Sequence, residues 1–411
     1  MSRSRRVLRP LAGSVVSLAA VLALGACGGD DDNGGEATAA SDGEPFKVLM
    51  IAPTSGPLKV AGDLEVAGAK AAIAEINEDG GILGHRVELT VEDDAADGNR
   101  AVSIAQEELA NGDEYNMVIP GITASDAPAL AAPLAAKPIL QITTASENVL
   151  NDPDKYPNLY SSSSTFRSNA AATVEKLEQD GITKVAFISG DAENAHDTAA
   201  DLKELAGEAG IEVVAEVFVP QDAPDATAQM QQALASRPEA LVSGSFTLAT
   251  QAIVKAASKL AADVPFYGDP FFSAADLSGS VKPEQLAKLN LASFPYLIKG
   301  SPGQDTPEYQ AFAAQVAKLA PKPAISLHAA VVSYNAIMLG RAAAQKAESI
   351  DGAATAKAME QVATIDDAPG FVGPEGAALF SSNQHIPQLA GSDFMWVKGG
   401  PIVNGILEPA Q

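Results

Sequence analysis

Cysteine is almost missing from this 411-residue chain, in which Cys27 is the only one. One thiol cannot form an internal disulfide, so the mature fold uses none. Histidine is scarce too, since the four copies lie far apart and no His-Glu-x-x-His helix or cysteine pair accompanies them. These absences leave a structural zinc site without support and predict a chain that needs neither a metal nor a cofactor.

Positive charge is also in short supply, because 27 lysines and arginines face 52 acids and the formal net charge is −25. Such a surface repels phosphates, so nucleic-acid binding is not expected. Catalytic signatures are missing as well: there is no Gly-x-Ser-x-Gly elbow, no P-loop and no Gly-x-Gly-x-x-Gly turn after a strand. The adjacent acids Asp93 and Asp94 would point to opposite faces of a strand. We predict a binding protein, with an enzyme as the weaker alternative.

The N-terminus has the pattern of a secretory signal. Four arginines and no acid occupy residues 1–9, and an apolar run follows from Val15 to Leu24. A basic start, a short apolar segment and small residues before a cleavage point are typical of a signal peptide, here residues 1–26. The run is too short for a permanent membrane span. Arg5-Arg6 leaves twin-arginine export open beside the general secretory route.

Cys27 closes that segment in the sequence Leu-Gly-Ala-Cys, which resembles a bacterial lipobox. The resemblance implies that Cys27 is diacylated and becomes the new N-terminus. Two acyl chains anchor a protein stably, so we expect an exported protein held on the outer face of the cell membrane. Residues 27–45, rich in Gly, Asp and Ser, then form a flexible linker. The alternative is an ordinary signal peptide with a coincidental cysteine.

From residue 46 onward, short apolar runs alternate with amphipathic stretches. A chain of this length favours two domains, and two series of alternating strands and helices are present, at about 47–142 and 169–268. This alternation predicts an α/β fold of two doubly wound lobes, each built on a parallel sheet covered on both faces. Long helices at 308–319 and 324–347 and a strand at 394–399 follow, and the pattern does not say which lobe they cover.

A series of short motifs adds a family resemblance. Ser55-Gly56-Pro57-Leu58 opens it, Gly80-Gly81-Ile82 follows, and Gly373-Pro374-x-Gly376 and Trp396-Val397-Lys398 close it. Their order and spacing over residues 46–405 resemble the type I periplasmic binding proteins of the leucine/isoleucine/valine-binding group.

The resemblance implies two lobes joined by a three-crossing hinge that closes around a small-molecule ligand. The N-terminal ligand-binding lobe would comprise 46–161 plus 295–368, and the C-terminal one 162–294 plus 369–411. The implied partners are the membrane subunits of an ABC permease. A lipoprotein of the same fold that senses its ligand is the alternative to a transport protein.

Ligands of open parallel sheets bind beyond the carboxyl ends of the strands. The loops at 121–127 and 143–148 lie there and are rich in hydroxyl groups, with a helix start that attracts an anion. The candidates in these loops are Thr123, Ser125, Thr143, Thr144, Ala145 and Ser146. Ser and Thr also favour helix caps and turns, so a purely structural role is the alternative for each residue.

The second lobe is expected to contribute Asn194, Phe246, Thr247 and Asp269 by position. The resemblance places Asp269 against a ligand ammonium group, with a turn or cap residue as the alternative. Two departures weaken the assignment of a ligand: Asn194-Ala195 stands where the family often has Tyr-Gly, and Ala61 replaces an aromatic residue. A branched-chain or other amino acid is the default, and a small carboxylate, an amide or an aromatic compound is its rival.

Overall fold

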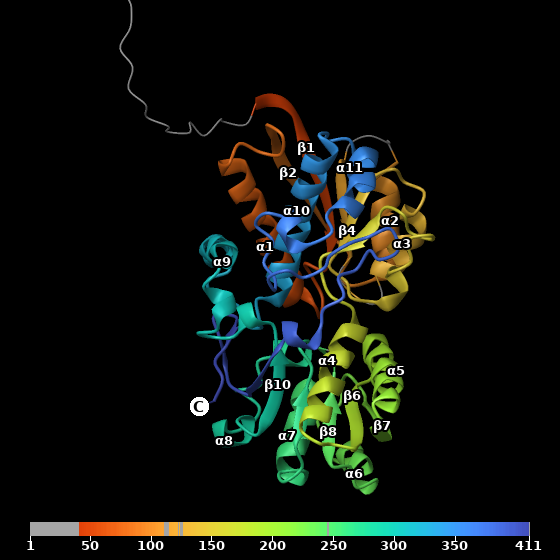
Figure 1. The fold of residues 1–411 in the computed structure, drawn as a ribbon, viewed down its shortest axis with the longest axis vertical. Coiled ribbons are helices and arrows are strands. Elements are labelled where there is room, and N and C mark those ends of the chain that lie inside the picture. The colour runs from red at the N-terminus through yellow and green to blue at the C-terminus, as the bar shows by residue number, and fades with distance from the viewer. Residues whose placement is uncertain (1–40, 111–114, 122, 124–125, 245, 411) are drawn as a thin grey trace, which may run out of the picture. The chain divides into compact units, whose positions relative to one another are not determined.

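The computed structural model describes residues 41–110, 115–121, 123, 126–244 and 246–410. Figure 1 shows that they form two α/β lobes, each built around its own sheet, as the sequence predicts. The first sheet has the strand order β2-β1-β3-β4-β5 and is parallel throughout. Its strands are β1 (Ser41–Ala52), β2 (His85–Asp93), β3 (Met117–Pro120), β4 (Leu140–Thr143) and β5 (Leu159–Ser161).

The second sheet has the order β11-β10-β9-β8-β6-β7. Its strands are β6 (Lys184–Gly190), β7 (Glu212–Val219), β8 (Ala240–Ser243), β9 (Phe266–Gly268), β10 (Leu289–Ser293) and β11 (Met395–Lys398). All neighbours are parallel except β10 and β11, where Ser293 pairs with Met395 in antiparallel register. The sequence predicted the β11 strand but not its direction. A two-stranded ribbon of β12 (Ile402–Val403) and β13 (Ile406–Leu407) follows.

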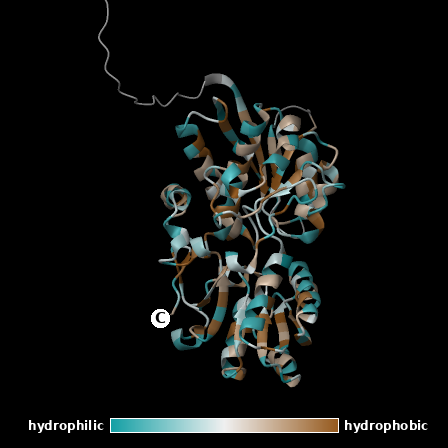
Figure 2. Cartoon of the chain, viewed as in Figure 1, coloured by the Kyte–Doolittle hydropathy of each residue, from teal (hydrophilic) through white to brown (hydrophobic). Residues whose placement is uncertain are grey.

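The helices cover the sheets on both faces. In the first lobe and the segment after β10 they are α1 (Lys59–Glu78), α2 (Gly98–Glu108), α3 (Ala127–Leu134), α9 (Pro307–Leu319), α10 (His328–Ala347) and α11 (Gly352–Ala358). In the second lobe they are α4 (Phe166–Gln179), α5 (Glu193–Glu208), α6 (Thr227–Ala235), α7 (Thr250–Leu260) and the short α8 (Pro283–Leu286). Figure 2 shows hydrophobic residues gathered along the strands and hydrophilic ones on the outer helices.

Strand β1 shows why this arrangement is stable. Its side chains alternate between two faces. Val48 and Met50 join the core beneath α1 and α10, whereas Leu49 and Ile51 join the core beneath α2 and α3. All four are at most 1% exposed. A strand buried on both sides has to be apolar at every position, which is what the run around Val48 and Met50 provides.

The chain passes between the two lobes three times. It leaves the first sheet after β5 and enters α4, returns after β10 to form α9, α10 and α11, and goes back to pair β11 with β10. Helices α9 and α10 both pack on α1, so the C-terminal helices that the sequence left unplaced lie on the first lobe. The predicted three-crossing fold class is confirmed, whereas the lobe boundaries stay predictions.

Helices α1 and α10 are in backbone contact at Gly68. A methyl group at Gly68 would lie 2.0 Å from the carbonyl oxygen of Ala330 and 2.5 Å from Ser333 Oγ. The Ser333 hydroxyl also donates a hydrogen bond of 2.6 Å to the carbonyl oxygen of Glu65. The contact therefore depends on a residue without a side chain. It holds α10 in place, and the start of α10 forms part of the cavity wall described below.

The described residues contain neither a membrane-spanning helix nor a cluster of metal ligands. No helix among them is both long enough and apolar enough to cross a membrane. No group of three or more His, Cys, Asp or Glu side chains in that part of the chain is arranged to hold a metal ion.

Candidate functional site

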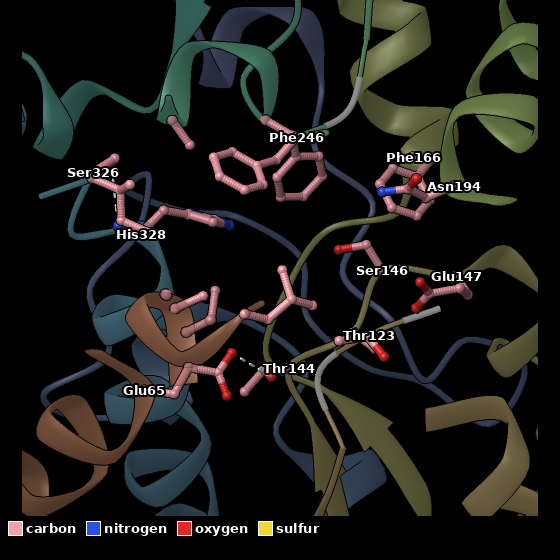
Figure 3. A pocket seen from close by; sticks show the side chains of 18 residues that line it. Glu65, Thr123, Thr144, Ser146, Glu147, Phe166, Asn194, Phe246, Ser326 and His328 are labelled. Carbon is pink, nitrogen blue, oxygen red and sulfur yellow. Dashed lines mark hydrogen bonds between the residues drawn. The ribbon is translucent and has the colours of Figure 1, made fainter. Parts of the chain in front are cut away.

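Loops that follow strands of both sheets line one cavity of about 210 Å³, shown in Figure 3. The first lobe contributes Leu58, Ala61, Glu65, Thr123, Thr144, Ala145, Ser146 and Glu147. The second lobe contributes Phe166, Asn194, Phe246, Phe271 and Ala274. The start of α10 and the residues before it add Ile325, Ser326, His328, Ala329 and Val332. The size and the mainly apolar lining suit a small molecule.

The turn after β3 is shaped by Gly121. Its φ is +68°, and a methyl group there would lie 2.8 Å from Asp126 Oδ1 and 2.9 Å from the Ala127 nitrogen. The same Asp126 oxygen accepts a 2.6 Å hydrogen bond from the Thr123 backbone N–H. Gly121 therefore lets the chain fold tightly enough for the Asp126 carboxylate to accept from the Thr123 N–H in the turn before α3.

The loop after β4 is held by its own hydroxyl groups. The Thr143 hydroxyl donates to the carbonyl oxygens of Gly121 (3.1 Å) and Pro120 (3.3 Å) and accepts from the Ala145 N–H (3.1 Å). Ser146 Oγ lies 2.8 Å from Ser163 Oγ. These contacts join the loop to β3 and to the first crossing, so they fix the cavity floor.

Two buried carboxyl groups face the cavity from the first lobe. Glu65 is 3% exposed and Glu147 is 4% exposed. Glu65 Oε1 accepts a 3.0 Å hydrogen bond from the Thr144 hydroxyl, which Figure 3 shows as a dashed line. Within the described residues, Oε2 of each glutamate has no hydrogen-bond partner. A buried acceptor without a partner is rare in folded proteins and indicates a site that a ligand completes.

Burial dominates the electrostatics of these acids. It raises the pKa of Glu65 well above its ordinary value, and the Thr144 hydroxyl offsets the rise only in part. Burial, with smaller contributions from the charges of Asp126 and Asp197, raises the pKa of Glu147 to about 7. Burial and then repulsion from Asp94 raise the pKa of Asp126 to about 7. A charged form is disfavoured in each case because water is excluded.

Aromatic rings form the opposite wall. The rings of Phe166 and Phe271 lie 5.3 Å apart in an edge-to-face arrangement. His328 stacks on Phe294 at 4.7 Å and meets Phe271 at 5.2 Å. Burial among these rings lowers the pKa of His328 to about 4, so its imidazole is neutral at pH 7. Figure 3 shows His328 and Phe246 across the cavity from Glu65 and Thr144.

Six of the residues predicted from the sequence come together in this cavity, namely Thr123, Thr144, Ala145, Ser146, Asn194 and Phe246. Ser125 and Cys27 lie outside the described residues. Thr143 does not line the cavity but holds its floor, as described above. Thr247 does not line the cavity. Its hydroxyl lies 3.1 Å from that of Thr250 at the start of α7.

Asp269 does not line the cavity either. It is 2% exposed, and its Oδ1 accepts a 2.7 Å hydrogen bond from the Phe272 backbone N–H in the short helical turn after β9. These contacts are those of a turn residue, the alternative that the sequence left open. Its carboxylate is therefore already committed to the backbone that presents Phe271 to the cavity.

Sequence reasoning missed the two glutamates and three of the rings, Phe166, Phe271 and His328. One signal was present in α1, where Glu65 shares a helical face with Gly68, Ala69, Ala72 and Ile76 at spacings of three and four. A carboxylate on a buried stripe is unusual and marks a functional candidate. Glu147 gave no such signal, because a glutamate in a polar loop is normally exposed.

A family model described as "Periplasmic binding protein" matches residues 45–390. The chain belongs to the periplasmic binding protein family. The resemblance noted in the sequence is thereby confirmed, and the two lobes with a cavity between their strand ends agree with it. Within this family, the chain is 39% identical over 72 residues to the Leu/Ile/Val-binding protein of Escherichia coli, which is 18% of this chain and 20% of that protein.

Other members extend the comparison. The chain is 37% identical over 94 residues to the Leu/Ile/Val-binding protein BraC3 of Rhizobium johnstonii, which is 23% of this chain and 25% of that protein. The chain thus matches only a fifth to a quarter of the length of these curated relatives.

Solved structures match over much more of the chain. A type 1 periplasmic binding protein from Bordetella pertussis has a TM-score of 0.73 at 18% identity and covers 89% of this chain and 100% of its own. A substrate-binding protein of a branched-chain amino acid transporter from Streptococcus pneumoniae, in complex with isoleucine, has a TM-score of 0.71 at 16% identity, with coverages of 89% and 98%. A solute-binding protein from R. palustris, in complex with 4-hydroxybenzoate, has a TM-score of 0.68 at 18% identity, with coverages of 90% and 96%. At these identities the likeness shows a shared fold.

Proposed function

We propose that this chain is an exported, lipid-anchored solute-binding protein that captures one small molecule between its lobes and delivers it to the permease of an ABC importer. The observation that carries the proposal is the cavity lined by loops from both sheets. A ligand that contacts both lobes favours the closed arrangement by its difference in affinity for the open and closed states. The permease then recognises the closed form. Membership of the periplasmic binding protein family supports this reading.

The relatives support a small solute without fixing which one. Similar proteins carry names or bound molecules that range from Leu/Ile/Val to isoleucine and 4-hydroxybenzoate. An amino acid is the default for this chain, and a small carboxylate, amide or aromatic compound is the rival. A ligand-sensing lipoprotein is the second candidate function, because the same closure would signal to a receptor.

A thermal-shift screen of amino acids, amines, amides and small carboxylates tests the proposal. A ligand that binds the folded state raises Tm by mass action, and about 100 times Kd of free ligand adds about 2.7 kcal/mol to the free energy of unfolding. We expect at least one class to raise Tm, and mass spectrometry to recover the solute unaltered. Conversion of the solute would contradict the proposal and indicate an enzyme. Loss of solute uptake when the gene is deleted would favour transport over sensing.

The lipid anchor has its own test. We expect Cys27→Ser to move the protein from the membrane fraction to the soluble fraction and to abolish incorporation of a labelled fatty acid, because the acylated thiol is removed. Asn33→Ser, a substitution in the predicted linker, is the matched control and should leave both properties unchanged. A Cys27→Ser protein that stays in the membrane fraction would show that Cys27 is not the anchor.

A further inference from the structure

The cavity contains acids and no cation. Its ionisable lining residues are Glu65, Glu147 and His328, and the imidazole is neutral at pH 7. No lysine or arginine is among the described residues that line it. The lining loops also include positions outside the described residues, and these are Ile122, Ala124, Ser125 and Ser245, none of which carries a charge. A ligand carboxylate would therefore find no positive charge here.

Several groups that could hold a carboxylate are already engaged. The Thr144 hydroxyl donates to Glu65, and the hydroxyls of Ser146 and Ser163 are hydrogen-bonded to each other. The Thr123 backbone N–H, in the turn before α3, donates to Asp126. Part of the hydroxyl-rich loops, which the sequence suggested as an anion cradle, thus serves the protein's own acids.

Two buried acceptors on the same wall have no donor among the described residues. Glu65 and Glu147 are more than nine-tenths buried, and Oε2 of each has no partner in the described part of the chain. Carboxylate oxygens accept hydrogen bonds, and an ammonium group supplies up to three donors and a positive charge. Binding of such a cation favours the ionised form of a buried carboxyl group and compensates for its loss of water.

The opposite wall fits the rest of such a ligand. The rings of Phe166, Phe246 and Phe271 line it, and an ammonium group within about 6 Å of a ring face is attracted to that face. Ile325 and Val332 extend the apolar surface toward α10. An alkyl or aryl body can lie against these side chains while its charged end faces the glutamates.

We infer that the solute is an apolar amine, a molecule with a protonated amino group and a hydrocarbon body but no carboxylate, and that one of the two buried glutamates, Glu147 or Glu65, is its counter-ion. The inference rests on the proposed function and narrows its solute class. It replaces the amino acid default by a simpler molecule, because the cavity has buried acceptors for an ammonium group, whereas no lysine or arginine among its described lining residues could pair with a carboxylate.

The test uses probes that share one hydrocarbon body and differ only in charge. Isothermal titration of the processed protein at pH 8 compares 3-methylbutylamine, leucine and 4-methylpentanoate. A second set compares 2-phenylethylamine, phenylalanine and 3-phenylpropanoate. We expect an amine to bind at least 10-fold more tightly than the amino acid of the same set, and the carboxylates to give no measurable heat. An amino acid or carboxylate that binds more tightly than its amine would overturn the inference.

Two variants locate the charge. Glu147→Gln and Glu65→Gln each keep the shape of the side chain, and the variant that removes the counter-ion should weaken amine binding at least 10-fold. Glu178→Gln, on the exposed face of α4, is the matched control and should leave binding unchanged. Thermal melts of each variant confirm folding before titration. Unchanged amine affinity in both cavity variants would overturn the assignment of the counter-ion.

The outcomes separate the inference from the proposed function. If no amine binds but another solute in the thermal-shift screen raises Tm, the inference fails and the binding function stands. If neither the amines nor any screened solute changes Tm, both fail.

Discussion

Replacing Gly68 with alanine is expected to lower the free energy of unfolding by about 3 kcal/mol, the upper end of the usual range for forcing extra atoms into a packed interface. The added methyl group would lie 2.0 Å from the Ala330 carbonyl oxygen. That oxygen belongs to the backbone of α10 and cannot move away alone, so the two helices have to separate. Their separation would also stretch the hydrogen bond from Ser333 to the Glu65 carbonyl.

Urea unfolding measures the effect as a lower midpoint at an unchanged slope. Gly207→Ala in α5 is the matched control, because nothing lies within 4 Å of a methyl group at that position. That substitution should leave stability unchanged or raise it by up to about 1 kcal/mol, since alanine is the better helix former. Equal midpoints for the two variants would contradict the close contact of α1 and α10.

Removing the ionisable group of Glu147 should make the free energy of unfolding of the ligand-free protein fall less steeply as pH rises. The pKa of Glu147 is about 7 in the folded chain against 4.5 for the free side chain, and burial is the main cause. Below pH 4.5 both states hold the proton, so the stability that this group contributes is fully present there. Between pH 4.5 and 7 only the folded state holds it, so the free energy of unfolding falls as pH rises.

The shift corresponds to about 3 kcal/mol across this window, at about 1.4 kcal/mol for each unit. Thermal melts of wild type and Glu147→Gln at pH 5 and pH 8 measure it. The Tm of Glu147→Gln minus the Tm of wild type should be several degrees larger at pH 8 than at pH 5. His385, which lies elsewhere, titrates in both proteins and cancels in this comparison, whereas Asp126 and Asp197 interact with Glu147 and contribute to the measured difference. A constant difference would contradict the burial of Glu147.

The fold was predictable because its signals are local. Apolar runs such as the one containing Val48 and Met50 have the length and composition of strands buried on both faces, and the helices between them follow a regular spacing. The position of α10 was not predictable from periodicity alone. Its sequence shows an apolar helix, and the family resemblance assigned residues 295–368 to the first lobe, but the packing of α10 on α1 at Gly68 comes from the structure.

The position of the site was predictable from the sequence, but the partners of its side chains were not. Thr123, Thr144 and Ser146 follow strands, so their place near the cavity comes from a general property of parallel sheets. What those residues bind depends on Glu65, which reaches Thr144 from α1, and on Asp126, which lies three residues after Thr123. Asp269 shows the same limit, because a carboxylate after a strand can face either a ligand or the following turn.

The pairing of β10 with β11 has a consequence for the order in which the parts of the protein are made. Strand β11 is synthesised long after its neighbour, because three helices of the other lobe lie between them. Strand β10 can already pair with β9, but its other edge stays unpaired until the last part of the chain is made, and an unpaired edge invites aggregation. Shortened chains that end before Met395 should therefore accumulate as insoluble material or be degraded, while the first sheet of the same molecule is already complete.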